Sequence, residues 1–155
     1  MKRDTKIVLG VIAAIPAAML SMSALCSWAI AQGAPMKLRL LFRLFCHGIP
    51  ERCLDLFGVP MPICARCVGI YLGMLAGIAV FWAISMPREI VMRRFAYVAA
   101  VPLAIDGLTQ AAGLRTSTNP LRMATGLIAG LAFGLWILSA VDRRGHDSSH
   151  ILDLT

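Results

Sequence analysis

Four apolar stretches, separated by short polar segments, run through the chain. They cover residues 7–30, 63–86, 95–114 and 123–141. Each approaches or exceeds the roughly 20 residues that an α-helix needs to cross about 30 Å of hydrocarbon. The pattern therefore predicts an all-α integral membrane fold with four transmembrane helices, forming a single membrane domain over residues 1–155. Residues 31–62 form a connecting loop that contains cysteine and histidine, and residues 142–155 form a polar tail that we expect to be loosely ordered.

The third stretch differs from the others because polar residues lie near its centre. One helical face carries Pro102, Asp106, Thr109 and Gln110. An aspartate near the centre of a membrane helix costs about 2.5–3.5 kcal/mol, so its carboxylate must be paired, protonated or hydrated inside the bundle. The candidate partners are Arg66, Arg115 and Arg122. Such a pair either belongs to a functional site or only locks helices together.

The connecting loop begins with an amphipathic pattern. In MKLRLLFRLF, Arg39 and Arg43 fall on one face of a helix, and leucine and phenylalanine side chains surround the other. This pattern predicts a short amphipathic helix, which either lies in the lipid headgroup plane or covers the bundle as an ordinary loop helix. Pro50, Pro60 and Pro62 then break regular structure before the second stretch begins.

Glycines recur every four residues in the second and fourth stretches. The two stripes are Gly69, Gly73, Gly77 and Gly126, Gly130, Gly134. A stripe without side chains lets helix backbones approach closely, so these helices are expected to pack on each other, within one protomer or across a homo-oligomer. Arg66 falls on the glycine side of its helix, opposite Cys67 and Tyr71.

Composition supports a lipid environment and argues against nucleic acid as a partner. Hydrophobic residues make up 59% of the chain, charged residues make up 15%, and the mean hydropathy is +0.77. Soluble domains average about 45–50% apolar and about 25% charged residues. The net charge of +7 is distributed over the ends of the apolar stretches, whereas a nucleic-acid-binding surface gathers its basic residues in one stripe.

The first apolar stretch has two interpretations. It follows the basic segment MKRDTK and ends near a small-residue site at Ala31, so it is either a transmembrane helix or a cleaved signal peptide. Both interpretations place the following loop on the outer face. With four spans, both termini are then cytoplasmic and the Cys/His loop lies outside the cell membrane.

Membrane topology brings polar residues from separate segments to one end of the bundle. The loop after the first stretch, the start of the second, the end of the third and the start of the fourth must lie on the same side. The polar residues gathered there are Arg52, Arg66, Tyr71, Asp106, Gln110, Ser117, Asn119 and Arg122. They adjoin Cys46, His47, Cys53, Cys64 and Cys67.

Several uncommon residues follow one another in a specific order. The segments are CHGIPER, PICARCVGIYLG and PLAIDGLTQ, followed by a serine and an asparagine before LR and TG. This order resembles the small predicted membrane proteins of the domain of unknown function 2085 family, over residues 45–135. The resemblance implies that the characteristic positions are Cys46, His47, Arg52, Cys64, Arg66, Cys67, Tyr71, Asp106, Gln110, Ser117, Asn119 and Arg122. It implies no particular activity.

The first candidate chemistry for this end of the bundle is a metal site, most simply zinc. Cys64 and Cys67 form a C-x-x-C pair with the spacing of a zinc knuckle, and Cys46 with His47 would complete four tetrahedral ligands. Cys53 is a substitute ligand. Because Cys46 and His47 are adjacent, their joint chelation of one ion requires an unusual local backbone.

The second candidate is thiol–disulfide exchange. A helix N-terminus stabilises the thiolate of a C-x-x-C pair, and Cys46 with Cys53 would form a loop pair that relays electrons. This layout is similar to that of the vitamin K epoxide reductase family and disulfide bond formation protein B, and the resemblance implies a quinone cofactor. In either chemistry, Arg66 is expected to compensate the charge of the neighbouring thiolates.

Two further interpretations remain open. The arginines with Asp106 and Gln110 would suit a carrier that binds an anion or a lipid headgroup near one membrane face. Alternatively, the chain is a scaffold whose cysteines form a structural disulfide. The sequence does not decide between an enzyme and a binding protein.

Overall fold

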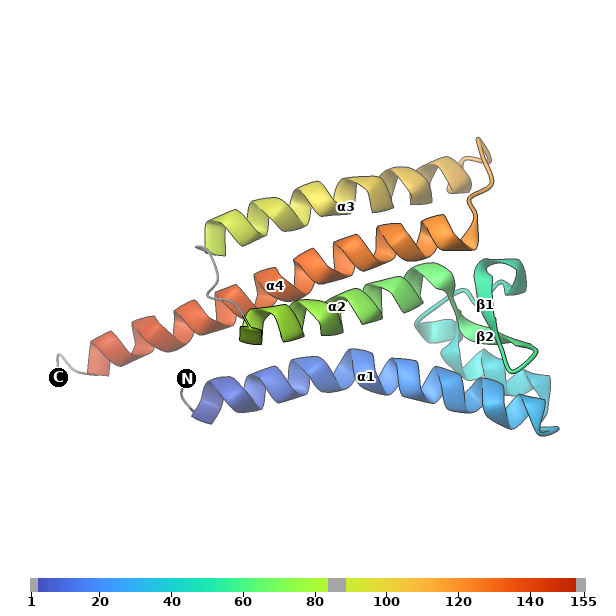
Figure 1. Ribbon diagram of the computed structural model, residues 1–155, viewed down its shortest axis with the longest axis horizontal. Helices are drawn as coiled ribbons and strands as arrows, with labels where there is room; N and C mark the ends of the chain where they lie inside the picture. Colours follow the sequence, from blue (N-terminus) through green and yellow to red (C-terminus); the bar gives the residue numbers. More distant parts are fainter. Residues whose placement is uncertain (1–2, 84–88, 153–155) are drawn as a thin grey trace.

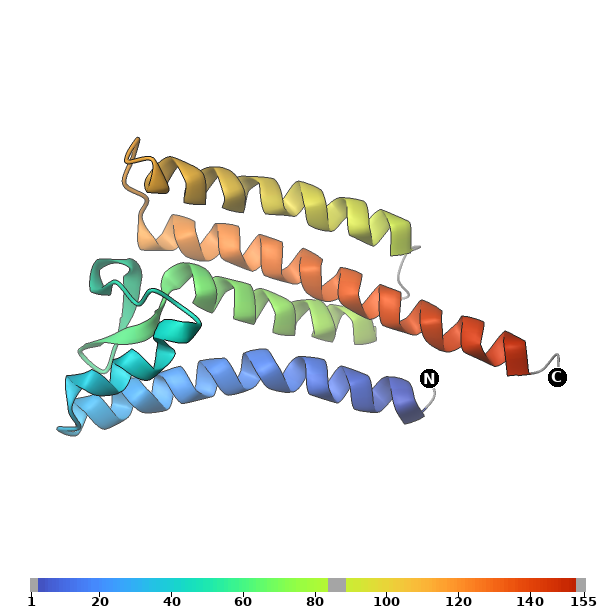
Figure 2. The ribbon, with the colours of Figure 1, turned by 180° about the vertical axis from the view of Figure 1, so that it is seen from behind.

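The computed structural model describes residues 3–83 and 89–152. Its elements are α1 (Arg3–Ala31), the 3-10 helices η1 (Met36–Leu44) and η2 (Pro50–Arg52), the strands β1 (Cys53–Leu56) and β2 (Val59–Cys64), and the helices α2 (Ala65–Ala83), α3 (Glu89–Ala111) and α4 (Asn119–Leu152). The long helices lie side by side in the order α1, α2, α4, α3 (Figure 1). The strands, the 3-10 helices and the loop between α3 and α4 lie together at one end, as the reverse view confirms (Figure 2).

Two helices in the described ranges are long and apolar enough to cross a membrane. They are Gly10–Ala31 within α1 and Asn119–Val141 within α4. The apolar part of α2, Ala65–Phe81, is shorter. The second apolar stretch of the sequence is longer than this part of α2, because it includes the last two residues of β2. Its end, at residues 84–86, lies outside the described residues.

Helix α4 continues beyond the fourth apolar stretch. We expected residues 142–155 to be loosely ordered, but the helix extends to Leu152. No proline follows Val141, so nothing in the polar segment removes a backbone N–H group or blocks the next helical turn. This part of the tail is therefore helical.

The backbones of α2 and α4 lie almost in contact. A Cβ atom on Gly73 would overlap the carbonyl oxygen of Leu127, and one on Gly130 would overlap that of Ile70. No larger residue fits at such positions without separating the helices. The close approach brings the first turns of both helices together, and these turns carry Arg66 and Arg122.

The strands β1 and β2 form an antiparallel hairpin that the sequence did not indicate. Phe57 and Gly58 connect them with φ values of 59° and 78°, as in a type I′ turn. We expected Pro60 and Pro62 to prevent regular structure, but a two-stranded ribbon leaves one edge of each strand unpaired, where proline is tolerated. This small sheet corrects the all-α expectation, and its register places the two ends of the hairpin beside α2.

The predicted amphipathic helix is present as the 3-10 helix η1. With three residues per turn, Arg39 and Arg43 do not share a face, so the single basic face was a wrong expectation. Arg39 turns toward the hairpin, where its Nη2 donates hydrogen bonds to the carbonyls of Gly48 at 3.2 Å and Met61 at 3.1 Å. On the other side, the side chain of Leu44 is 90% exposed.

Candidate metal centre and polar network

A group of cysteine and histidine side chains lies where the hairpin meets α2. Cys46 and His47 follow η1, Cys64 ends β2, and Cys67 lies in the first turn of α2. The ligand atoms of Cys46, His47 and Cys64 all lie within 4.8 Å of one another. Cys67 adjoins them, with its Sγ 3.6 Å from the Sγ of Cys64. We call these four residues the Cys/His cluster.

The backbone turns sharply at the first two members of the cluster. The Sγ of Cys46 lies 3.6 Å from Nδ1 of His47 and accepts a hydrogen bond from the backbone N–H of Cys64 at 3.2 Å. Gly48 follows with a φ of +56°, and a Cβ atom there would lie 2.9 Å from the Pro62 carbonyl oxygen. This glycine therefore permits the unusual local backbone that brings adjacent cysteine and histidine side chains together.

Hydrogen bonds between the thiols determine which sulfur ionises first. Those donated by Cys64 and then by Cys67 lower the pKa of Cys46. The same contact with Cys46 raises the pKa of Cys64, because it favours the protonated form of that thiol. Cys46 and Cys64 are buried, whereas His47 is exposed. The cluster thus offers three sulfur atoms, which bind a metal ion as thiolates, and an imidazole at the surface.

Cys53 lies near the cluster but has a different environment. It is buried, and its thiol donates a hydrogen bond to the Ile49 carbonyl at 3.1 Å. Burial raises the pKa of Cys53 to about 11, so the thiol keeps its proton at neutral pH. Cys53 does not belong to the group of ligand atoms that converge within 4.8 Å in the described residues.

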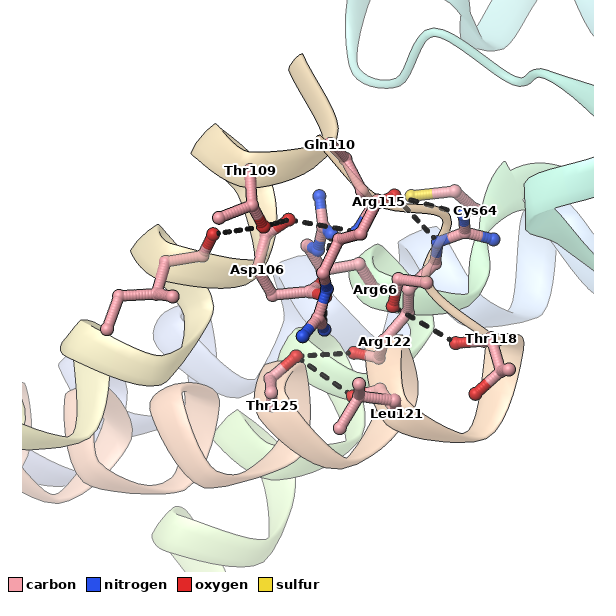
Figure 3. Close-up of polar contacts among 12 residues, drawn as sticks. Cys64, Arg66, Asp106, Thr109, Gln110, Arg115, Thr118, Leu121, Arg122 and Thr125 are labelled. Atoms are coloured by element: carbon pink, nitrogen blue, oxygen red, sulfur yellow. Dashed lines mark hydrogen bonds and ion pairs between the residues drawn. The ribbon is translucent and has the colours of Figure 1, made fainter. Parts of the chain in front are cut away.

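Two arginines bind the buried carboxylate of Asp106, which lies on α3 (Figure 3). Arg66 of α2 bonds to Oδ2, and Arg115 of the loop between α3 and α4 donates from Nη2 to Oδ1 at 2.9 Å. The ionic partner expected for Asp106 is thus confirmed, and two of the three candidates supply it. Removing either side of such a buried pair is costly, because the remaining charge loses its compensation.

The structure corrects the role expected for Arg66. Its guanidinium does not compensate thiolates but reaches Asp106 on a different helix. The reason is its place on the glycine side of α2, which faces α4, whereas Cys67 packs against the apolar core beneath the hairpin. The arginine that approaches a cysteine is Arg39, whose Nη2 lies 3.9 Å from the Sγ of Cys53.

Arg39 is a residue of this region whose contacts the sequence did not predict. Its position in an amphipathic pattern indicated a surface residue, yet the side chain is half-buried and fastens the loop to the hairpin. Its partner Met61 lies 22 residues away in the chain. No local signal in the sequence identifies such a contact.

A second set of hydrogen bonds connects α3, α4 and the hairpin. The guanidinium of Arg122 donates to Oε1 of Gln110 at 3.0 and 3.2 Å and to Oδ1 of Asn119 at 2.8 Å. The Nδ2 of Asn119 donates to the carbonyl of Cys53 at 2.9 Å. The predicted polar residues of α3 and α4 are therefore tied to β1, which lies in the chain between His47 and Cys64 of the Cys/His cluster.

The three remaining predicted positions have separate surroundings. Ser117 is buried beside the Asp106 carboxylate. Arg52, in η2, lines a cavity with Arg115. Tyr71 lies one turn after Cys67 and packs against the apolar core around the cluster. Most of the polar residues thus form one hydrogen-bonded network, whereas Arg52 only lines the cavity. Tyr71 belongs to the apolar core on the other side of α2.

Comparison with known proteins places this arrangement in a family. The family described as a predicted membrane protein, DUF2085, matches residues 46–136. An uncharacterized protein of Methanocaldococcus jannaschii is 41% identical over 100 residues, which cover 63% of this chain and 64% of that protein. An uncharacterized protein of Methanothermobacter thermautotrophicus is 40% identical over 100 residues, which cover 64% of this chain and 88% of that protein. No solved structure matches the chain. The family match includes the whole Cys/His cluster and both arginines of the Asp106 pair, and the chain belongs to this family of predicted membrane proteins of unknown function, DUF2085.

Proposed function

We propose that Cys46, His47, Cys64 and Cys67 bind one zinc ion, which fastens the loop between α1 and α2 to the end of a membrane-embedded helix bundle. The observation that carries this proposal is the convergence of three ligand atoms within 4.8 Å, with a further thiol 3.6 Å from one of them. Thiolate sulfur and imidazole nitrogen are the ligands that zinc prefers in structural sites.

The distances within the cluster suit tetrahedral coordination. With Zn–S bonds of about 2.3 Å and Zn–N bonds of about 2.0–2.1 Å, two sulfur ligands lie about 3.8 Å apart, and a sulfur and a nitrogen about 3.6 Å apart. The Sγ atoms of Cys64 and Cys67 are 3.6 Å apart, and Cys46 Sγ lies 3.6 Å from His47 Nδ1. Small side-chain movements would close the four ligands on one ion.

A site with four protein ligands is structural, because no coordination position remains for water or substrate. The ligands come from the segment after η1, the end of β2 and the first turn of α2. One ion would therefore join an irregular loop segment to the end of a strand and the start of a helix. Cys53 is left out of this ligand set because its thiol donates a hydrogen bond to the Ile49 carbonyl, whereas the Sγ of Cys67 contacts that of Cys64 directly.

The proposal places the zinc site at the outer face of a multi-pass protein of the cell membrane. In this arrangement all four long helices span the bilayer, and both termini are cytoplasmic. Two features support the embedding of α2 and α3 in the bilayer: the glycines of α2 and α4 allow the shorter α2 to pack within the bundle, and the charge of Asp106 on α3 is compensated by two arginines. The two glycine stripes would act inside one protomer.

The test is elemental analysis of full-length protein, purified gently in detergent with a tag that contains no histidine. We expect about one equivalent of zinc per chain, together with five thiols that react after unfolding with a chelator present and without a reductant. Absence of metal in protein with reversibly formed disulfides would reject the zinc site. That result would favour the thiol–disulfide alternative, which a quinone reduction assay would then examine.

Zinc binding is expected to weaken steeply as the pH falls. A cysteine thiol ordinarily has a pKa of about 8.5, so the thiols of Cys64 and Cys67 carry their protons in the metal-free state over most of the range below pH 8. Because zinc binds their thiolates, the zinc-bound state holds two fewer protons, and lowering the pH favours release. With two thiol protons displaced, the apparent affinity should fall at least about 100-fold for each pH unit, because the imidazole ligand must also be unprotonated to bind zinc.

A zinc-sensitive dye would follow this release between pH 8 and pH 5 in about half-unit steps, with a fixed excess of zinc chelator. Circular dichroism at the same pH values would separate zinc release from loss of helix. A zinc affinity that does not change over this range would contradict binding through protonated thiols.

A further inference from the structure

A cavity of about 570 Å³ lies between η2, the end of α3 and the start of α4. Three of its lining residues are Arg52, Arg115 and Arg122, which come from three different segments of the chain. Gln110 and Ser117 add polar groups to the wall. This volume falls within the range of about 300–1,000 Å³ typical of small-molecule sites.

The charges around this cavity are not balanced. Arg122 is only 6% exposed, and its hydrogen bonds go to the neutral side chains of Gln110 and Asn119. In the described part of the chain, no carboxylate forms an ion pair with Arg122 or Arg52. The guanidinium of Arg122 is also repelled by those of Arg52 and Arg66.

The nearby acidic groups do not remove this imbalance. The Asp106 carboxylate is already bound by Arg66 and Arg115, and it attracts Arg122 only from a distance. Glu51 lines the cavity but is exposed, so water screens its charge. The surroundings of the cavity thus hold four arginines but only two carboxylates, one of which is already paired. A buried cation without an anionic partner is destabilising.

We propose that this cavity binds a phosphate group, which Arg52, Arg115 and Arg122 hold from three sides. Guanidinium groups form paired, charge-assisted hydrogen bonds with phosphate oxygens, and several arginines suit an anion with several oxygens better than they suit one carboxylate. The hydroxyl of Ser117 adds a donor on the same wall. The phosphate belongs either to a lipid headgroup or to a soluble compound, since both present the same oxygens.

This site is distinct from the proposed zinc site but is connected to it. Arg122 binds Asn119, which donates to the carbonyl of Cys53 in the hairpin. No ligand atom of the Cys/His cluster lines the cavity. Loss of phosphate binding and loss of zinc are therefore separable by substitution.

Arg52→Gln is the variant of choice. The side chain is only partly buried and has no hydrogen bond or ion pair within the described residues, so its replacement leaves the Asp106 pair and the Arg122 hydrogen bonds in place. The matched control is Arg94→Gln, which removes the same charge from an exposed position near the other end of α3. Equal circular dichroism spectra and melting temperatures of both variants and the wild type would show that the fold is preserved.

Two probes distinguish the sources of the phosphate. Isothermal titration calorimetry of detergent-purified, full-length protein with inorganic phosphate tests a soluble anion. Native mass spectrometry after incubation with mixed vesicles of phosphatidylglycerol and phosphatidylcholine tests a lipid headgroup. We expect one bound equivalent in at least one assay, weakened about tenfold or more by Arg52→Gln and unchanged by Arg94→Gln.

Binding of inorganic phosphate would assign a soluble ligand, and retention of one phosphatidylglycerol would assign a lipid. Either result, with the expected difference between the two variants, supports the proposal. Binding of neither probe would overturn it. Equal weakening by both variants would also overturn it, because that result would indicate diffuse attraction to positive charge.

Discussion

Replacing Cys64 by serine is expected to release zinc and to lower the melting temperature of the protein. Cys64 is the central ligand, because its Sγ lies 3.6 Å from that of Cys67 and within 4.8 Å of the ligand atoms of Cys46 and His47. A serine hydroxyl does not ionise at neutral pH and binds zinc poorly. Loss of a hydrogen bond to a metal ligand reduces metal affinity about 10–100-fold. Loss of the ligand itself should therefore reduce the zinc affinity by more than about 100-fold.

Mass spectrometry with inductively coupled plasma would measure the zinc content, and thermal unfolding in the same detergent would measure stability. Cys26→Ser is the matched control, because Cys26 is buried in the same apolar core on α1 but contributes no ligand atom to the cluster. It should retain its zinc, and so should Cys53→Ser. If Cys53→Ser releases zinc while Cys64→Ser retains it, the assigned ligand set is wrong.

The Gly73→Ala substitution is expected to destabilise the helix bundle by about 1–3 kcal/mol or more. The added methyl group would overlap the Leu127 carbonyl oxygen and lie 2.7 Å from the backbone nitrogen of Leu131. Both are backbone atoms of α4, so the overlap cannot be relieved by a side-chain rotation and the two helices must separate. Denaturation by sodium dodecyl sulfate in mixed micelles, followed by circular dichroism, would measure the change in unfolding free energy.

Gly10→Ala is the matched control for the same chemical change in a helix. A Cβ atom on Gly10 of α1 would meet nothing within 4 Å. There the substitution should be neutral or stabilise the helix by up to about 1 kcal/mol, because alanine restricts the unfolded chain more than glycine does. Equal effects at both positions would show that the approach of α2 to α4 does not depend on Gly73.

The two stability predictions concern different parts of one end of the molecule. Separation of α2 from α4 would displace Arg66 and Arg122, because both lie in the first turns of these helices. Gly73→Ala should therefore also weaken phosphate binding, whereas Cys64→Ser should act mainly on the loop and the hairpin. Comparison of the two variants would show how far the zinc and phosphate sites depend on each other.

The long helices and the partner of Asp106 were predictable because both depend on local features. A long apolar segment forms a helix in a lipid environment, since every backbone N–H and C=O group must be bonded within the segment. An aspartate among apolar residues demands a cation, and Arg66 and Arg115 supply it. Neither inference requires knowledge of how the connecting loop folds.

The structure of the loop was not predictable, because it depends on contacts between residues far apart in the chain. The turn at Phe57 and Gly58 connects two paired strands. These strands were not predicted because β2 contains prolines, which usually interrupt strands. The 3-10 geometry of η1 turned Arg39 inward, toward Met61 on the hairpin. A hydrophobic periodicity does not distinguish this short, tight helix from an α-helix at the surface.

The sequence by itself determined that this is a helical membrane protein, and that its cysteines, histidine and arginines gather near one end. The tertiary structure decided which of these side chains meet: Cys46 and His47 converge with Cys64, whereas Arg66 joins Asp106. The physical reason is that helices follow from local apolar patterns, whereas the convergence of ligands depends on the backbone conformation at Gly48 and on the register of a hairpin.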